Sequence, residues 1–440
     1  MGLPVRKRLK DVPLLDVFIV LVFFLSNLTA LAFWFNFWLF ITAYRFAVPQ
    51  IMMVGINCLL WLITAGVLFR QLYKQGKWWE YLGIWKQKRI LLVFLALAFL
   101  SIFWSINPWI SAYKVFLLLA ATAVGIYLGK NYSFFRMLDL LFWFFSIAIL
   151  FSTALALLKP GVGTMEEYPY FGAWCGPFWN RNHLGSLSAL SSAILLLRLL
   201  YLGRKNNRLF WADLVVLGVS LLVTYKTRSA TGYILTIALL GSIILAGLWL
   251  RYRRQLTRKH YLIILSIFVV TVLICLSQLD FIFGLMGRNA SLTGRIPLWG
   301  ALFNYAISKN PWIGYGYGAI WSMGVFRDGL RLPIDWSRAI LIADNGYIDI
   351  LLSVGIAGFI PFIFTYIQTW IVSIRQVLTS KTMIDFFPAI FLLYTLIANI
   401  TFSLFMETEV FVWMLIIYVL IRCGIENGVS ANFPKPEPVE

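Results

Sequence analysis

The sequence predicts an all-α polytopic membrane protein with about twelve transmembrane helices. Of its 440 residues, 61% are hydrophobic and only 12% are charged, whereas soluble domains carry about 25% charged residues. Apolar runs recur at lengths that cross a hydrocarbon core of roughly 30 Å. These runs lack the two-residue alternation of membrane β-barrels, and a helix satisfies its backbone polar groups within its own segment.

The expected spans follow one another closely, apart from one long connection between the ninth and the tenth. Their approximate bounds are 14–33, 47–69, 90–106, 109–129, 135–158, 183–202, 210–226, 229–250, 261–280, 346–372, 386–404 and 409–423. Segment 281–345 is expected to form a large external loop. We expect one integral membrane domain over residues 1–426, followed by a disordered cytoplasmic tail at 427–440, which is polar and contains prolines.

Basic residues predict the orientation of these spans. Cytoplasmic connections are enriched in Lys and Arg, and alternate connections of this chain hold most of its 37 basic residues. Several basic residues also precede the first span, which is long enough to be an uncleaved anchor. We therefore expect both termini in the cytoplasm. The formal charge of +19 follows from this arrangement and does not indicate a nucleic-acid partner.

The external loop 281–345 is where we expect chemistry. It contains six basic residues and three aspartates, although external loops are usually poor in cations. A cationic surface just outside the bilayer suits an anionic ligand such as a lipid phosphate or pyrophosphate. The loop also contains a Gly/Trp/Tyr-rich stretch, 309–318, which is either a binding or structural loop or part of an interfacial aromatic belt.

Arg228 and Arg295 are the candidate anion-binding residues. Arg228 lies in the tight connection between two spans, where a guanidinium can direct two donors at a phosphate. Arg295 lies two residues before Pro297, which suits the first turn of a helix, so Arg295 is expected near a helix N-terminus that favours anions. The alternatives are an ordinary interfacial arginine for Arg228 and a solvated loop charge for Arg295.

Asp344 opens the stretch Asp-Asn-Gly-Tyr-Ile-Asp, directly before a span. It is the leading candidate for a general base or for a group that orients a hydroxyl. The same position also favours a simple helix cap. Asp349 lies about one turn inside the span, where a carboxylate is costly and is usually functional or paired.

A second set of polar and aromatic residues is expected to provide substrate contacts. These residues are Arg181, His183, Arg288, Tyr315, Tyr317, Asn345 and Tyr347. For His183, a buried structural role is an equally good explanation. The sequence contains no Walker loop, no H-E-x-x-H motif and no nucleophile elbow, which disfavours ATP-driven transport and metal catalysis.

Four stretches of the chain carry a joint resemblance. They are Trp104–Pro108 with Ser111, Gly172–Gly185, Arg228–Gly232, and a last group made of Thr293–Arg295, Asn310–Gly316 and Asp344–Tyr347 with Gly355 and Gly358. In this order, and with this topology, they resemble the O-antigen ligase and polymerase superfamily of bacterial cell-surface polysaccharide assembly. The second stretch looks most like the exopolysaccharide-polymerase branch.

The resemblance implies a GT-C-like glycosyltransferase of the bacterial inner membrane with a periplasmic active site. Family members transfer a glycan from undecaprenyl pyrophosphate to an acceptor hydroxyl, and neither a metal nor a nucleotide cofactor is expected. Arg228 and Arg295 match the positions implied to bind the pyrophosphate. Many members have a histidine where this chain has Asp344, and a carboxylate there can still accept a proton or orient a hydroxyl.

Polymerisation of lipid-linked repeat units is the preferred function, with a second repeat unit as the acceptor. The first alternative is an O-antigen ligase, which uses lipid A-core as the acceptor in lipopolysaccharide synthesis. The second is a flippase for a lipid-linked oligosaccharide, for which we would expect intramembrane charges and paired repeats; neither is evident. Membrane lipids and a chain-length regulator are further candidate partners.

Overall fold

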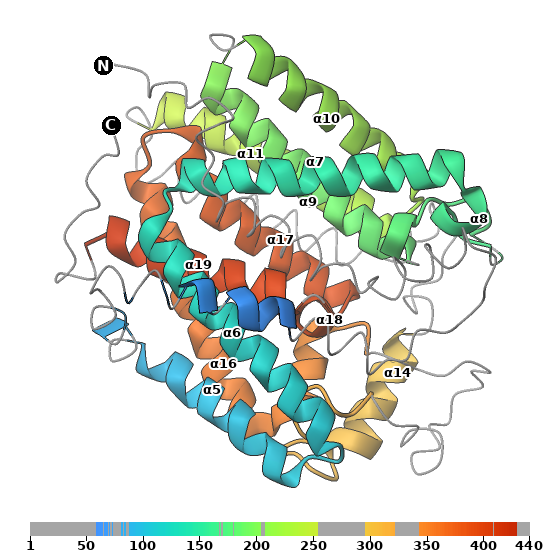
Figure 1. Ribbon diagram of the computed structural model, residues 1–440, viewed down its shortest axis with the longest axis vertical. Coiled ribbons are helices and arrows are strands. Elements are labelled where there is room, and N and C mark those ends of the chain that lie inside the picture. The colour runs from blue at the N-terminus through green and yellow to red at the C-terminus, as the bar shows by residue number, and fades with distance from the viewer. Residues whose placement is uncertain are drawn as a thin grey trace.

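In the computed structural model, the regular secondary structure of the described residues is helical (Figure 1). The structure describes residues 88–253, 295–321 and 343–428, without 167, 169, 179, 204–206 and 408, and it describes parts of 59–84. Within these ranges, the β pairing consists of one isolated antiparallel bridge between Thr164 and Trp174. The all-α fold class is confirmed for this part of the chain.

Seven of the described helical segments are long and apolar enough to cross a membrane. They are α6 (Pro108–Asn131), α7 (Phe134–Leu158), α9 (Arg181–Leu202), α10 (Asn207–Lys226), α11 (Ala230–Tyr252), α16 (Gly346–Thr379) and η7 (Met383–Phe386) joined to α17 (Phe387–Thr401). The other helices are α5 (Arg89–Leu100), η2 (Ser101–Trp104), α8 (Pro160–Gly163), η3 (Gly176–Phe178), α14 (Arg295–Ala301), the π-helix η6 (Leu302–Ile307), α18 (Leu404–Glu407) and α19 (Glu409–Glu426). The chain is therefore a multi-pass membrane protein.

The expected spans agree with the described helices to within a few residues at most ends. The largest difference is in α16, which continues to Thr379 instead of ending near residue 372. The expected spans 14–33 and 261–280 lie outside the described residues, as does most of 47–69, so the total of twelve stays a prediction. The expected tail is described only as far as Gly428.

Two helices, α19 and α9, form the centre of the fold. Where α6 packs on α19, a Cβ at Gly125 or Gly129 would lie 2.6 Å or 3.0 Å from carbonyl oxygens of α19. α9 packs against both α10 and α11 (Figure 1), and Gly185 of α9 meets Gly232 of α11 backbone to backbone. Small residues let membrane helices approach this closely. The second contact brings the N-terminal turns of α9 and α11 together.

α16 is interrupted at Gly355, whose φ of 63° and ψ of −171° are not helical. The loop 310–318 inserts at this break and satisfies backbone groups that the helix leaves free, as a membrane requires. The amides of Tyr315 and Gly316 donate to the carbonyls of Leu352 and Ser353 (2.9 and 3.0 Å), and the amides of Ile356 and Ala357 donate to the carbonyls of Pro311 and Trp312 (2.8 and 3.0 Å). The sequence did not predict this insertion.

A small hydrophobic cluster attaches α14 and η6 to the start of α16. Leu298 and Leu302 pack there with Ala343, Ile348 and Leu352. The cluster is separate from the main core of the bundle. It holds the first turn of α14 beside the segment that leads into α16.

Candidate active site

The turn between α10 and α11, residues 227–229, is hereafter the Arg228 turn. Arg228 has a φ of 50°, a left-handed conformation that costs a non-glycine residue about 1 kcal/mol or more. Ser229 then caps α11, and its hydroxyl accepts the Gly232 amide hydrogen at 3.2 Å. Because the turn is this short, the Arg228 side chain is exposed at the end of the bundle.

Neighbouring groups hold Arg228 by its backbone and its side chain. The guanidinium of Arg181 donates to the Arg228 carbonyl and stacks on the Tyr170 ring, 3.5 Å from the ring centre. Arg228 Nη1 in turn donates to the Phe171 carbonyl at 3.3 Å. Since Arg181 is only 4% exposed, the structure places it as a support for Arg228; a direct substrate contact for Arg181 stays a prediction.

A second strained turn, residues 343–345, lies directly before α16 and is hereafter the Asp344 turn. Asp344 has a φ of 51°, and its Oδ2 accepts a hydrogen bond from Arg295 Nε at 2.9 Å. The two residues are 49 positions apart in the sequence. The Arg295 side chain is 10% exposed and that of Asp344 is 31% exposed, so this ion pair lies at the edge of the protein interior.

Asn345, and not Asp344, caps α16. Its Oδ1 accepts the amide hydrogens of Tyr347 and Ile348 at 3.0 Å and 3.2 Å. The expectation that Asp344 serves as the helix cap is therefore wrong. Because Asn345 takes the free amides of the first turn, the Asp344 carboxylate is available to Arg295.

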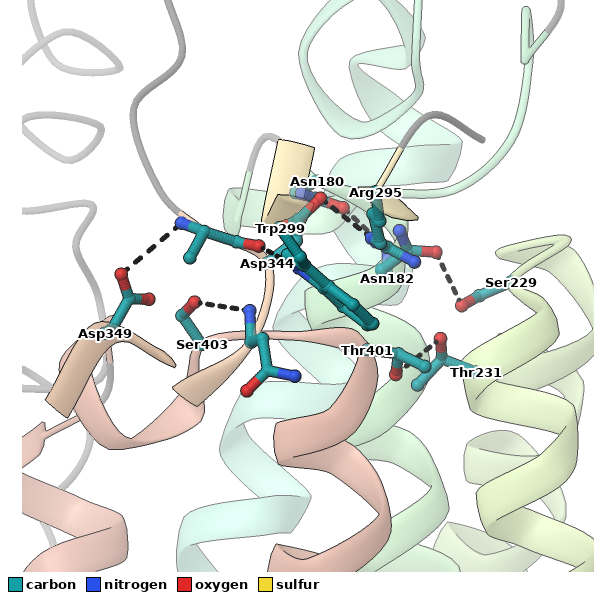
Figure 2. Close-up of polar contacts among 12 residues, drawn as sticks. Asn180, Asn182, Ser229, Thr231, Arg295, Trp299, Asp344, Asp349, Thr401 and Ser403 are labelled. Atoms are coloured by element: carbon teal, nitrogen blue, oxygen red, sulfur yellow. Dashed lines mark hydrogen bonds and ion pairs between the residues drawn. The ribbon is translucent and has the colours of Figure 1, made fainter. Parts of the chain in front are cut away.

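Side chains from other elements fix the backbone on both sides of Asp344 (Figure 2). The indole N–H of Trp299, on α14, donates to the Ala343 carbonyl at 2.8 Å. The Asn345 amide donates to the Ser403 hydroxyl at 3.1 Å. Tertiary contacts therefore stabilise the left-handed conformation of Asp344 and the direction of its side chain.

The segment 401–403, which runs from the last residue of α17 to the residue before α18, connects the two turns (Figure 2). On the side of the Arg228 turn, Ser229 donates to Asn182 Oδ1 at 2.8 Å, and Thr231 donates to Thr401 Oγ1 at 3.1 Å. On the side of the Asp344 turn, the Ser403 hydroxyl of the same segment accepts the Asn345 amide hydrogen. The two turns therefore lie at the same end of the bundle.

Three long helices, α9, α11 and α16, begin at this end. Their N-caps are Asn180, Ser229 and Asn345. Helix N-termini carry a partial positive charge that favours anions. Arg228 and Arg295 add two positive charges, whereas Asp344 provides the single carboxylate of these two turns. This arrangement forms a site suited to a multiply charged anion.

His183 packs against the segment 401–403, and Tyr347 packs against α18, which follows it. The His183 ring centre lies 4.2 Å from that of Phe402, and the Tyr347 ring centre lies 5.5 Å from that of Phe405. These contacts support the turns from the bundle side. A substrate contact for either residue stays a prediction.

Tyr315 and Tyr317 belong to the loop inserted in α16. The Tyr315 hydroxyl donates to the Ala306 carbonyl at 2.8 Å, and burial raises the pKa of Tyr315. Tyr317 is 1% exposed and its ring packs edge-on against Phe94. These contacts hold both tyrosines within the loop, and a substrate contact for either one stays a prediction. Arg288 lies outside the described residues.

Trp299 and Ser403 are site residues that sequence reasoning missed. Trp299 follows Arg295 by four residues, a spacing that places both on one face of α14 and was available as a signal. No local pattern marked Ser403, which reaches the site only through the fold of α17 and α18. The described residues contain no group of three His, Cys, Asp or Glu side chains placed to hold a metal ion.

The sequence of this region matches a known family. Residues 214–363 match the model described as O-antigen ligase, Wzy_C. Over these residues, the chain is similar to the O-antigen ligase family. The matched residues include both turns and the break in α16, and the resemblance seen in the motifs is confirmed. Members of this family transfer lipid-linked glycans.

The chain is also similar to the exopolysaccharide production protein ExoQ of Rhizobium meliloti (strain 1021). The two sequences are 27% identical over 229 residues, which cover 50% of this chain and 51% of that protein. The similarity thus spans about half the length of each protein.

Proposed function

We propose that this protein polymerises undecaprenyl-pyrophosphate-linked oligosaccharide repeat units at the periplasmic face of the bacterial inner membrane. The observation that carries this proposal is the Arg295–Asp344 ion pair at the same end of the bundle as Arg228. Metal-independent transfer from a lipid pyrophosphate needs cations for the leaving group and a group that handles the acceptor hydroxyl. These three side chains supply both.

In the proposed site, Arg228 and Arg295 hold the donor pyrophosphate. Arg295 uses Nε for Asp344, and its two terminal nitrogens donate to no described residue, so they are available to phosphate oxygens. A guanidinium keeps its charge and presents several donors in one plane. Neutralising the pyrophosphate stabilises the negative charge that develops on it as it departs.

The proposed reaction is an inverting displacement at the anomeric carbon of the donor glycan. The acceptor oxygen forms a bond to this carbon while the bond between the carbon and the pyrophosphate oxygen breaks. Asp344 orients the acceptor hydroxyl and takes its proton. The bonding electrons leave with undecaprenyl pyrophosphate, whose charge the two arginines balance.

The wider architecture in this proposal has about twelve helices in one GT-C-like domain, with both termini in the cytoplasm. The helix ends that carry the Arg228 turn and the Asp344 turn then face the periplasm. Basic residues at the opposite ends of these helices, such as Arg251 and Arg375, support this orientation.

The acceptor distinguishes polymerisation from ligation. The name of ExoQ, an exopolysaccharide production protein, supports polymerisation, whereas the description of the family model, O-antigen ligase, supports ligation. A polymerase needs only a second lipid-linked repeat unit as its acceptor.

The test uses purified full-length protein in lipid nanodiscs without an ion gradient. Its substrate is the lipid-linked repeat unit extracted from the source bacterium after deletion of this gene. We expect a ladder of lengthened glycans from this substrate alone. Product that forms only after addition of lipid A-core would establish the ligase instead, and folded protein that forms no new glycosidic bond with either acceptor would contradict both functions.

A further inference from the structure

Asp349 is a fully buried carboxylate to which the proposed reaction gives no role. It lies on α16, one turn after Asn345, and it is 0% exposed. An unpaired carboxylate inside a membrane protein is costly. Within the described part of the chain, no Lys or Arg forms an ion pair with Asp349.

The contacts of Asp349 lead to the Asp344 turn. Its Oδ1 accepts the indole N–H of Trp321 at 2.7 Å and the amide N–H of Ala343 at 3.4 Å. Ala343 immediately precedes Asp344, and a dashed line at Asp349 in Figure 2 marks this contact. The carboxylate thus holds the backbone just before the candidate catalytic residue.

Ser403 makes a similar contact on the other side of Asp344. Its hydroxyl accepts the Asn345 amide hydrogen at 3.1 Å. Each of the two amides that flank Asp344 is therefore held by a side chain, that of Ala343 by Asp349 and that of Asn345 by Ser403.

This arrangement matters because Asp344 adopts a backbone conformation that it would not adopt alone. Its φ of 51° is left-handed, and such residues persist only where surrounding contacts hold them. The same conformation directs the Asp344 carboxylate to Arg295 Nε. Without the flanking contacts, the turn would relax and the carboxylate would move away from the donor site.

We propose that Asp349 is a positioning residue that acts through Asp344. It works as a buried hydrogen-bond acceptor that holds the Ala343 amide, while Ser403 holds the Asn345 amide. It carries no proton in the reaction and does not touch the substrate. This inference rests on the proposed function, in which Asp344 handles the acceptor hydroxyl.

Two substitutions separate an acceptor role from a charge role. Asp349→Leu has nearly the same shape but accepts no hydrogen bond, and we expect kcat for glycan transfer to fall by about 30-fold at an unchanged KM for the extracted lipid-linked repeat unit, since small displacements of reacting groups cost up to about 100-fold. Asp349→Asn keeps an acceptor oxygen at the same place. It should stay within about threefold of the wild-type kcat. Equal loss in both variants would overturn the proposal.

A double-mutant cycle tests whether Asp349 acts through Asp344. In an Asp344→Asn background, Asp349→Leu should reduce kcat by no more than about twofold further, because the group that it positions is already gone. If the two single-variant losses in kcat instead multiply in the double variant, the positioning role is overturned. Ser403→Ala should show the same dependence on Asp344, and it takes the place of Asp349→Leu if that variant does not fold.

Asp213→Leu is the matched control. Asp213 is also a fully buried aspartate within a span, but it pairs with Arg198. Arg198 is 17 residues along α9 from Arg181, or roughly 25 Å at 1.5 Å per residue. This variant should lose thermal stability, while its folded fraction keeps kcat and shows no coupling to Asp344→Asn.

The design also separates this inference from the proposed function. If Arg295→Ala transfers glycan at the wild-type rate, the proposed function fails whatever Asp349 does. If Arg295→Ala is inactive while the kcat losses of Asp349→Leu and Asp344→Asn multiply, only the positioning role fails.

Discussion

The Arg228 turn and the Asp344 turn carry their candidate functional residues in the same backbone conformation, but different contacts hold the two turns. Their φ values are 50° and 51°, and among the described non-glycine residues these two have positive φ. Each turn lies directly before a long helix. The Arg228 turn is held mainly through its own backbone carbonyls, since Arg181 donates to Arg228 and the Trp174 amide donates to Lys226 at 3.0 Å.

The Asp344 turn instead depends on side chains from three separate segments. Trp299, Asp349 and Ser403 each bind a backbone group next to Asp344. The difference follows from the connections. α10 and α11 are adjacent in sequence, so a packed helix fixes each end of their short link. The Asp344 turn follows a long loop, and only packed side chains can fix it. We therefore expect the Asp344 turn to be more sensitive to single substitutions around it.

The largest expected effect is the loss of either arginine. Arg228→Ala and Arg295→Ala should each lower glycan transfer by about 10²- to 10³-fold, because each removes donors from the departing pyrophosphate. Arg375→Ala, an exposed arginine near the other end of α16, should transfer glycan at the wild-type rate. Product per folded protein is the measurement.

Inorganic pyrophosphate provides a second readout for the arginines. It should raise the unfolding temperature of the wild-type protein and of Arg375→Ala, but not that of either active-site variant. A variant that loses Arg228 or Arg295 and keeps both transfer and this stabilisation would contradict the proposed mechanism.

Replacing Asp344 should reduce turnover and leave donor binding nearly intact. We expect Asp344→Asn to lower kcat by about 10²-fold with little change in the donor KM, because an amide cannot take the acceptor proton. Asp344→His restores a side chain that can take a proton and should recover part of the activity above roughly pH 6.5, where imidazole is neutral. An Asn variant as active as the wild type would remove Asp344 from the chemistry.

Smaller effects should distinguish the supports of the two turns. Trp299→Phe removes one hydrogen bond to the Ala343 carbonyl, which is worth about 1 kcal/mol, or about fivefold. We expect this loss in kcat and not in pyrophosphate affinity. Tyr170→Ala removes the ring stacked on Arg181 and should weaken pyrophosphate binding by a similar factor. Tyr170→Phe keeps the ring and serves as its control.

The proposed difference between the two turns is wrong if the effects on kcat and on pyrophosphate affinity are exchanged between these variants. A Trp299→Phe variant that loses mainly pyrophosphate affinity, or a Tyr170→Ala variant that loses mainly kcat, would show that the two supports do not act on separate steps. Calorimetric titration with inorganic pyrophosphate and steady-state kinetics measure the two quantities on the same preparations.

The smallest expected effect is that of metal removal. If arginine charge alone stabilises the departing pyrophosphate, EDTA should leave the transfer rate of the wild type unchanged within about twofold. A rate that collapses in EDTA and returns with added Mg²⁺ or Mn²⁺ would show that the arginines do not suffice.

Much of the fold followed from the sequence because its signals are local. Lengths of apolar runs placed α6, α7, α9, α10 and α11 close to their observed bounds. The position of Pro297 predicted a helix around Arg295, and Arg295 lies in α14, which is described from Arg295 to Ala301. Such features depend on neighbouring residues and on the thickness of a bilayer, and both can be read along the chain.

The sequence misled where two local explanations competed. Asp344 and Asn345 are both good helix caps, and composition alone could not show that Asn345 takes the role. The Gly/Trp/Tyr-rich stretch similarly fitted several interpretations. Its insertion at Gly355 became visible only when the partner backbone groups of α16 were in place.

By itself, the sequence determined the helical membrane fold, the similarity to the O-antigen ligase family and the residues that carry charge at one end of the helices. Tertiary structure alone decided that Arg295 meets Asp344 across 49 positions. It also decided that Trp299, Ser403 and Asp349 hold the Asp344 turn. The reason is physical: helix formation and membrane crossing depend on short-range pattern, whereas the direction of a strained turn depends on contacts between segments that only packing brings together.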